Sequence, residues 1–334
     1  MPVVTDFTEL QAACQTSGTV QVANNITLLN YITIPNTADV TIESLTGNQT
    51  LYAPDSIHLY ALGDGTQGGG AKLTLQNITL DGSHTHGGVH LGYTYLNPSA
   101  GGTLILNSGA IIQNCLNTTG FSGGDGAGIG MRGGIMEMHD GAIIQDNINS
   151  YGAAGGIDLE NNMYPPYIGS QLKMTGGLIT RNSAKTSGGG VNITQGATFL
   201  MTGGTISYNK AHHGGGVQID ANLGESSFTM NNETGQSLIT HNYSQTFGGG
   251  VALNSYVASG TSTFDFQDGS ITYNQAGEAG GGIGIADWTF SEEHVESGIR
   301  IVNQSGGIIA HNTAPFGGGV LISDLDESEL TALR

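Results

Sequence analysis

The chain has few basic residues. Of its 334 residues only 8 are Lys or Arg, whereas 27 are Asp or Glu, which gives a formal net charge of −19 at pH 7. Because proteins that bind nucleic acids neutralise backbone phosphates with Lys and Arg, we expect no nucleic acid partner. The excess of carboxylates is compatible with bound calcium, and equally with a solvated, self-repelling surface that keeps the protein soluble.

Cysteines and long apolar runs are also scarce. Cys14 lies in the N-terminal segment and Cys115 in the middle of the chain, and nothing in the pattern brings them together, so we expect both to be unpaired. No apolar run reaches the roughly 18 to 20 residues of a membrane-spanning helix, and no charged n-region followed by an apolar h-region opens the chain. We therefore expect no direct insertion into a membrane.

Glycine, in contrast, is abundant, with 56 residues, and it recurs inside a repeated motif. One copy spans residues 172–194 and reads LKMTGGLITRNSAKTSGGGVNIT, and the next spans 199–220 and reads FLMTGGTISYNKAHHGGGVQID. Further copies, some of them looser, contain Asn114, Asp146, Leu253, Ile285 and Ile322. Self-similarity at this period indicates stacked structural units.

Each repeat contains three short apolar runs with period-two alternation, separated by Gly or Asn, and no amphipathic helix. The repeat is also shorter than the about 40 to 45 residues of a four-stranded propeller blade. The pattern predicts an all-β fold, a right-handed parallel β-helix of roughly ten stacked coils with three strands each. We expect one domain over residues 1–334, with an N-terminal cap at 1–18, coils at 19–323, and a C-terminal cap or linker at 324–334.

A short helix is expected in the N-terminal cap. Thr5 or Asp6 can cap this helix, and Phe7, Leu10 and Ala13 then lie on one face. A helix across the open end of a β-helix covers the apolar interior and the strand edges of the first coil.

One Asn recurs at the same place in each regular repeat. Because Asn tolerates left-handed backbone conformations, and its amide can hydrogen-bond to the same residue one coil away, we predict a stacked ladder at one corner. Its predicted members are Asn182, Asn209, Asn242, Asn274 and Asn312. The residues directly before them are expected to pack along the same corner, namely Arg181, Tyr208, His241, Tyr273 and His311.

The motif GGxI[TS]xNxA followed by GGG[VI]x[IL] resembles the repeats of chlamydial polymorphic outer-membrane proteins and of right-handed parallel β-helix adhesins on bacterial and archaeal cell surfaces. The resemblance covers roughly residues 100 to 325, and Val4 to Tyr52 is similar to the entry segment of pectate-lyase-like surface domains. It implies an extracellular domain on a cell surface, excised from a longer secreted protein. Because β-helices carry lyases, hydrolases, esterases and binding proteins alike, the resemblance leaves the function open.

The third strand of each repeat directs Val and Ile inward, so the alternate residues face outward. The first outward column is His90, Gly130, Asp158, Asn192, Gln218, Ala252, Gly284 and Leu321. The second is Gly92, Arg132, Glu160, Thr194, Asp220, Asn254, Ala286 and Ser323. The middle coils therefore carry a polar cluster, formed by Arg132, Asp158, Glu160, Asn192, Gln218 and Asp220.

This polar cluster suggests an enzymatic alternative. With coils about 4.8 Å apart, Glu160 and Asp220 would lie roughly 9 to 10 Å from each other, near the upper end of the separation in an inverting glycosidase. A pectate-lyase-like site would instead place a basic residue above a calcium ion held by carboxylates, and Arg132 is the only Arg or Lys in this cluster. The same side chains could also simply cover an exposed sheet face.

Insertions after the third strands emerge along one edge of the rod and carry aromatic residues. These aromatics are Tyr93, Tyr95, Tyr164, Tyr167, Tyr256, Trp288 and Phe290. Flat aromatic faces suit stacking against sugar rings, although each ring could equally fold back on its own loop. The expected ligand-binding residues are these aromatics together with Asp158, Asn192 and Gln218.

Two short motifs suggest metal binding. His84, His86 and His90 lie in HTHGGVH, and Asp125 lies in GGDGAG, where a carboxylate can bind calcium. Neither motif has the spacing or the partner residues of a strong metal site. We therefore assign no metal ligands and no cofactor, and keep calcium as an open alternative.

Three functional classes remain. The first expectation is a non-enzymatic cell-surface adhesin or glycan-binding module, monomeric as a domain, whose partner is a host or plant glycan or a surface protein. The second is a polysaccharide lyase or glycoside hydrolase that acts on an acidic or plant-type polysaccharide through Glu160, Asp220, Asp158 and Arg132. The third is a structural stalk without a ligand.

Overall fold

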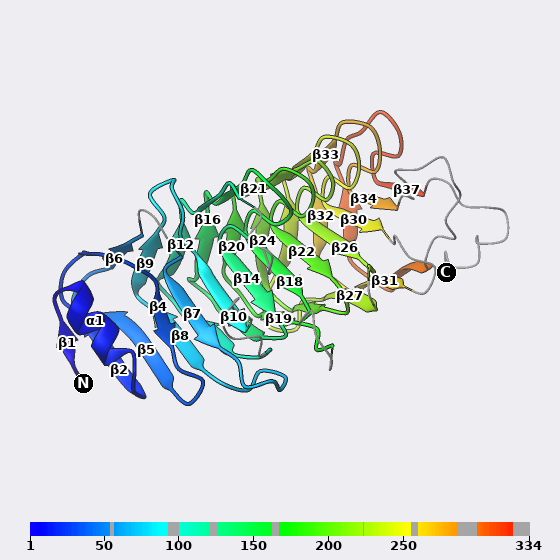
Figure 1. Cartoon of the computed structure of the whole chain (residues 1–334). Coiled ribbons are helices and arrows are strands. Elements are labelled where there is room, and N and C mark those ends of the chain that lie inside the picture. Colours follow the sequence, from blue (N-terminus) through cyan, green and yellow to red (C-terminus); the bar gives the residue numbers. More distant parts are fainter. Residues whose placement is uncertain are drawn as a thin grey trace.

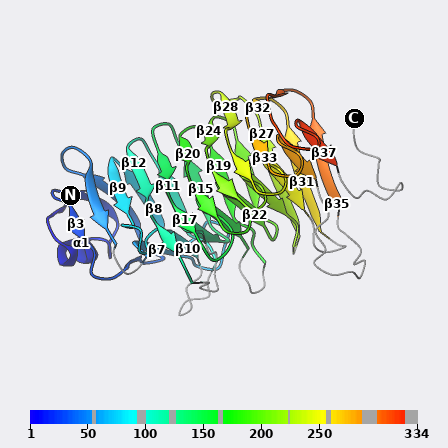
Figure 2. The same cartoon turned by 90° about the horizontal axis from the view of Figure 1, so that it is seen from above.

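The strands stack into an elongated rod with the N-terminus at one end (Figures 1 and 2). The computed structural model describes residues 1–53, 57–92, 100–119, 126–161, 167–222, 224–254, 260–285 and 299–322. In these ranges the strands form four sheets, and each strand pairs with its equivalent in the next coil.

Three of the sheets run along the length of the rod and the fourth is shorter. Sheet A contains β1 (Val3–Val4), β2 (Gly18–Val22), β5 (Asp39–Ser44), β8 (Lys72–Gln76), β11 (Thr103–Leu106), β15 (Ile135–Met138), β19 (Gln171–Met174), β23 (Thr198–Met201), β27 (Glu225–Met230), β31 (Thr261–Phe266) and β35 (Ile299–Gln304). Sheet B contains β3 (Ile26–Thr27), β6 (Gln49–Tyr52), β9 (Ile78–Asp81), β12 (Ala110–Gln113), β16 (Ile143–Gln145), β20 (Leu178–Thr180), β24 (Gly204–Ser207), β28 (Ser237–Thr240), β32 (Ser270–Thr272) and β36 (Ile308–Ala310). Sheet C contains β4 (Ile32–Ile34), β7 (Leu59–Leu62), β10 (Val89–Gly92), β14 (Ile129–Arg132), β18 (Ile157–Glu160), β22 (Val191–Thr194), β26 (Val217–Asp220), β30 (Val251–Asn254), β34 (Ile283–Ile285) and β37 (Val320–Ile322). The short corner sheet contains β13 (Leu116–Asn117), β17 (Ile148–Asn149), β21 (Ser183–Ala184), β25 (Lys210–Ala211), β29 (Tyr243–Ser244) and β33 (Gln275–Ala276).

The chain visits sheets A, B and C in a fixed order before it returns to A one coil further along, and from β13 to β33 each coil also passes through the corner sheet between B and C. Every strand pair is parallel, for example Leu172 with Phe199 in sheet A and Val191 with Val217 in sheet C. The predicted all-β parallel β-helix is thus confirmed. The structure differs from the prediction in one respect: the regular coils contain a fourth strand, which is two residues long. This strand forms where the backbone stays extended just after a sharp corner.

The N-terminal cap has the predicted helix. Helix α1 (Phe7–Ala13) begins after Asp6, whose side chain accepts a hydrogen bond from the Glu9 backbone N at 2.9 Å. Leu10 is fully buried in the core of the first coil, and Phe7 and Ala13 pack against it. The helix therefore covers the apolar end of the rod, as a β-helix requires.

The interior consists of stacked apolar columns. In sheet A, Phe199, Phe228 and Phe264 occupy one column, with ring centroids 4.6 and 4.9 Å apart and interplanar angles of 11° and 9°. Such contacts add about 0.5 to 1.5 kcal/mol per pair beyond the burial of apolar area. The two cysteines, Cys14 and Cys115, are buried and free, as predicted.

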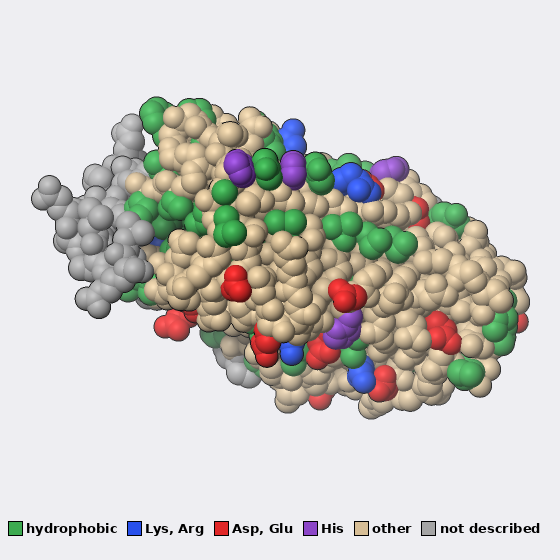
Figure 3. Space-filling model, turned by 180° about the vertical axis from the view of Figure 1, so that it is seen from behind, with side chains coloured by type: hydrophobic (Ala, Val, Ile, Leu, Met, Phe, Trp, Pro, Cys, Tyr) green, Lys and Arg blue, Asp and Glu red, His purple; other side chains and the backbone are tan. Residues whose placement is uncertain are grey.

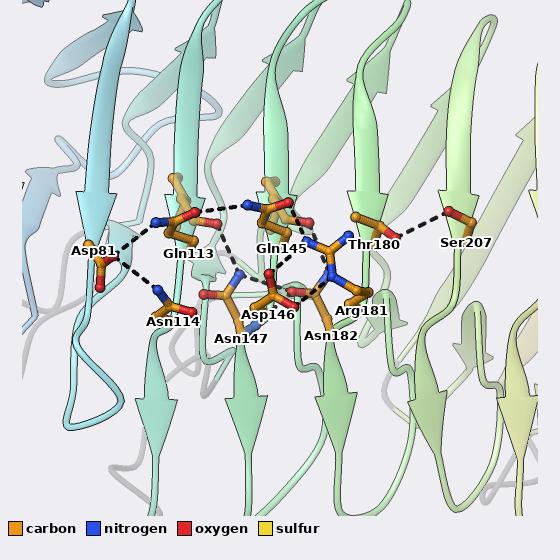
Figure 4. A network of polar contacts seen from close by, with 12 residues as sticks. Asp81, Gln113, Asn114, Gln145, Asp146, Asn147, Thr180, Arg181, Asn182 and Ser207 are labelled. Atoms are coloured by element: carbon orange, nitrogen blue, oxygen red, sulfur yellow. Dashed lines mark hydrogen bonds and ion pairs between the residues drawn. The ribbon is translucent and has the colours of Figure 1, made fainter. Parts of the chain in front are cut away.

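The Asn ladder lies at the corner between sheet B and the corner sheet (Figure 4). Asn182 shows the repeated geometry: its Nδ2 donates to Oδ1 of Asn209 at 3.0 Å and to the Ile144 carbonyl in the preceding coil at 3.0 Å. All five predicted members take part, and the ladder also includes Asn147. At its start, the backbone N of Cys115 donates to Oδ1 of Asn147 at 2.9 Å.

The left-handed conformation falls on the residue before each ladder Asn and not on the Asn itself. Arg181, Tyr208 and His241 have φ of 54°, 55° and 55°. A non-glycine residue in this region costs about 1 to 3 kcal/mol, and it persists because the turn directs the next side chain inward to the ladder.

The glycine triplet before each strand of sheet C is required by close backbone contacts. A Cβ on Gly188, which has a φ of +64°, would lie 2.7 Å from Cβ of Asn192. A Cβ on Gly190 would lie 2.7 Å from the Gly216 carbonyl oxygen of the next coil. The absence of these Cβ atoms therefore lets each coil pack directly against the next. It also lets the backbone of the triplet approach the outer face of sheet C.

Candidate binding site on the outer face of sheet C

Within the described ranges, the outward columns of sheet C have the predicted register, whereas Ala286 and Ser323 of the second column lie outside these ranges. The first column follows the pairs His90 with Gly130, Gly130 with Asp158, Asp158 with Asn192, Asn192 with Gln218, Gln218 with Ala252, Ala252 with Gly284, and Gly284 with Leu321. In the second column Arg132 pairs with Glu160, and Asp220 lies between Thr194 and Asn254. The structure therefore brings together the polar residues of the middle coils.

These polar side chains are not exposed, which corrects the interpretation of an open sheet face. Asp158, Asn192 and Gln218 retain only 2%, 5% and 4% of their accessible surface. Further along the same face, residues directly before the glycine triplets form a second layer: Phe247 packs with Ala279 and with Leu321 of the first outward column. The sequence signal for this second layer is a large side chain at that position, as in FGGG and HGGG.

His213 extends this second layer. Its ring stacks on Phe247 with a centroid distance of 5.0 Å, and its Nδ1 is hydrogen-bonded to the Thr246 hydroxyl. Burial, together with the neighbouring His212, lowers the pKa of His213 to about 3. The imidazole is therefore neutral at physiological pH and packs as part of this second layer.

An ion pair lies at one end of the polar cluster. Nη2 of Arg132 lies 3.2 Å from Oε2 of Glu160, and the two side chains are 6% and 18% exposed. Burial and the charge of Arg132 lower the pKa of His90 to about 4, so His90 is neutral beside this pair. In the adjacent first column, Nδ2 of Asn192 donates to Oδ1 of Asp158 at 2.9 Å.

Strand β26 lies at the other end and presents two oxygen acceptors on one face. Oε1 of Gln218 and Oδ1 of Asp220 are both enclosed, and neither has a hydrogen-bond partner among the described residues. Burial raises the pKa of the Asp220 carboxyl to about 7. An enclosed acceptor without a partner costs about 1 to 3 kcal/mol, so this strand carries unused hydrogen-bonding capacity.

The two carboxyl groups of the predicted catalytic pair thus lie in different environments. Glu160 on β18 is paired with Arg132, whereas Asp220 on β26 is desolvated, and β22 lies between their strands. Two strand spacings correspond to about 9.6 Å. Divergent environments for two carboxyls are what acid and base catalysis requires, and they are equally compatible with binding.

The predicted aromatic residues fall mainly outside the described part of the chain. This applies to Tyr93, Tyr95, Tyr164, Tyr256, Trp288 and Phe290. Tyr167 is described, and it lies between β18 and β19 with 65% of its surface exposed. Its ring is accessible to a ligand at the edge between sheets C and A.

The predicted metal motifs remain without further support. His84 has a positive φ of 58° in an exposed turn, whereas the ring of His90 packs edge-on against Tyr60, with centroids 5.6 Å apart. In the described ranges, no three His, Cys, Asp or Glu side chains gather in a way that could hold a metal ion. Asp125 lies outside these ranges, and calcium binding stays a prediction.

The fold and this face define a parallel β-helix repeat protein with a covered polar cluster on one sheet. Comparisons with models of protein families, with curated proteins and with solved structures found no match. Across the described residues, no helix has the length and apolar character needed to cross a membrane.

Proposed function

We propose that this chain is a non-enzymatic glycan-binding module of a cell-surface adhesin, and that it binds its ligand at the outer face of sheet C. The observation that carries the proposal is the pair of enclosed acceptors on β26, Oε1 of Gln218 and Oδ1 of Asp220. Sugar hydroxyls are O–H donors, and hydroxyl groups that reach these oxygens would remove the cost of leaving them unpaired in the free protein.

The surroundings of β26 support a hydroxyl-rich ligand. Asp158 and Asn192 add carboxylate and amide groups in the neighbouring coils, and Tyr167 offers an accessible ring at the edge of the sheet. A small set of polar groups beside an aromatic face is the composition of a site that orients a sugar. The partner in this proposal is a host or plant glycan, or a glycosylated surface protein.

The resemblance of the repeats to β-helix adhesins supports the extracellular setting. In this setting the chain is a monomeric domain of a longer secreted protein, and the rod holds the binding face away from the cell. The stacked coils make such a scaffold stiff, because each coil is hydrogen-bonded to its neighbours along its length.

A glycan and polysaccharide array, with and without calcium, tests the proposal. The Gln218→Met variant removes the acceptor with little change in volume, and Gln171→Met makes the same change on the exposed outer face of sheet A. We expect Gln218→Met to weaken binding about tenfold, equivalent to one lost hydrogen bond, and Gln171→Met to bind as the unmodified chain does. If no glycan binds under either condition, the module is a stalk.

A glycoside hydrolase is the second candidate, because the pKa of Asp220 near 7 suits a general acid and Glu160 remains available as a base. The same array wells, assayed for new reducing ends and for unsaturated products, decide between the two functions. Hydrolysis that is lost in Asp220→Asn and in Glu160→Gln would establish the enzyme. Binding without any product would establish the adhesin.

A further inference from the structure

A second groove lies above the corner sheet, on other strands than the candidate site on sheet C. It has a volume of about 650 Å³ and runs across β17, β21 and β25. Its polar lining includes Lys185, Lys210, His212, Gln245, Ser150 and Asn149. Among the described residues that line it, none is Asp or Glu.

This composition is unusual for a chain in which acidic residues outnumber basic ones by 27 to 8. The two arginines in the middle of the rod are neutralised, because Arg181 lies 2.7 Å from Asp146 and Arg132 lies 3.2 Å from Glu160. Lys185 and Lys210 are both exposed, and neither forms an ion pair with a described residue. The groove is therefore a positively charged strip on an acidic rod.

The parallel register fixes how these groups are arranged. Ser183 pairs with Lys210, which places Lys185 beside His212 in the next coil. Lys185 and Lys210 thus lie on a diagonal between neighbouring coils, with their Cα atoms roughly 8 Å apart. In the following coil Oε1 of Gln245 lies 2.9 Å from Nδ1 of His212, so the row of polar groups runs along the axis of the rod.

Aromatic rings border the same corner. The ammonium of Lys210 lies 5.6 Å from the ring centroid of Tyr243, within the range of a cation–π contact. Beside it, the exposed rings of Tyr208, His241, Tyr273 and His311 stack with centroids 4.9 to 5.2 Å apart. Figure 3 shows His and hydrophobic side chains alternating in a row along the rod, with basic side chains close by.

We propose that this corner groove binds an anionic polysaccharide that carries carboxylate or sulfate groups at intervals along its chain. The two lysines match a sparsely charged polymer, whereas a densely charged one such as nucleic acid would be repelled by the net charge of the rod. The small side chains of Ala184 and Ala211 and the exposed Ile148 offer an apolar floor for sugar rings. This site goes beyond the glycan site on sheet C, because it lies on another sheet and uses other residues.

Binding of the full chain to two pairs of polymers tests the proposal. Polygalacturonate is compared with its methyl ester, and dextran sulfate with dextran, so that the carboxylate and sulfate sources are distinguished. The variants are Lys185→Gln, Lys210→Gln and the double substitution, with Lys173→Gln on the exposed face of sheet A as the matched control. Thermal melts verify that each variant is folded.

We expect at least one charged polymer to bind and its neutral counterpart not to bind. The double substitution should weaken this binding about tenfold at low salt and reduce its salt dependence, because two exposed charge contacts are lost. Lys173→Gln and Gln218→Met should leave the binding of the charged polymer unchanged. This result would separate the corner groove from the candidate site on sheet C. The proposal is overturned if neither charged polymer binds, if the neutral polymers bind equally well, or if Lys173→Gln weakens binding as much as the double substitution does.

Discussion

The side chain of Asn209 joins three coils: its Nδ2 donates to Oδ1 of Asn242 at 3.0 Å and to the Ile179 carbonyl at 3.0 Å, while its Oδ1 accepts from Asn182. Each ladder Asn therefore acts as both donor and acceptor, in a site where water cannot replace it. Because removal of one member leaves donors and acceptors unpaired in two neighbouring coils, the ladder should be highly sensitive to substitution.

The Asn209→Ala variant should lose about 2 to 5 kcal/mol of unfolding free energy, since several buried groups would lose their partners at once. Chemical denaturation measures this loss. Asn36, which is exposed, provides the control, and Asn36→Ala should change stability by less than about 0.5 kcal/mol. Equal stability of the two variants would contradict a structural role for the ladder.

The Gly190→Ala variant should be destabilised by about 1 to 3 kcal/mol. Its new Cβ would lie 2.7 Å from the Gly216 carbonyl oxygen, and neither backbone can move without separating two coils. Gly235→Ala is the matched control, because a Cβ there meets nothing within 4 Å. Thermal melts of both variants check the prediction, which fails if Gly190→Ala melts at the temperature of the control.

The Arg132→Met variant should cost more stability than Arg181→Met. Arg132 and Glu160 form a largely buried pair, and removal of one partner from such a pair costs about 3 to 5 kcal/mol because a desolvated charge remains. The Arg181 pair with Asp146 has side-chain exposures of 51% and 35%, so its loss should cost less than about 1 kcal/mol. Denaturation curves that place the two losses at the same value would contradict this ranking.

His58 should make the fold sensitive to acid. Its ring is fully buried, accepts a hydrogen bond from the Gly88 backbone N at 2.9 Å, and has Nε2 2.9 Å from the Leu51 carbonyl oxygen. Burial lowers its pKa from 6.5 to about 4, so the neutral form is required in the folded state. The stabilising contribution is complete above pH 6.5 and is lost as the pH falls from 6.5 to about 4, at up to about 1.4 kcal/mol per pH unit.

The His58→Gln variant isolates this effect, since an amide can replace both hydrogen bonds but does not titrate. When the pH is lowered from 7 to 4, the unfolding free energy of the unmodified chain should fall by more than that of the His58→Gln variant. Asp220 acts in the opposite direction, because its raised pKa makes stability fall as the pH rises toward 7. This effect is the same in the unmodified chain and in the variant, so it cancels in the comparison. Parallel stability curves over this range would rule out His58 as the group responsible.

Much of the architecture follows from local pattern alone. Period-two alternation sets which side chains of each strand face inward, and the repeated Asn and Gly fix the corners, so the columns from His90 to Leu321 and the ladder from Asn182 to Asn312 could be aligned without coordinates. Asn147 is less evident from the motif, because its repeat reads IIQDN and has Gln where the regular copies have Thr or Ser. The capping helix was predictable from Asp6 and from the spacing of Phe7, Leu10 and Ala13.

The sequence by itself thus determined the repeating coil and the inner and outer face of each strand, because both depend on neighbouring residues and on strict repetition. Only the tertiary structure decided which outward residues are accessible. Phe247 packs over part of sheet C from a segment outside the strand, and burial raises the pKa of Asp220. A large side chain before the glycine triplet marks the position of the second layer in the sequence, but its contacts and the burial of Asp220 depend on how the coils stack. The groove of Lys185 and Lys210 likewise exists only because two repeats are stacked, since its width and charge come from side chains that lie in different coils.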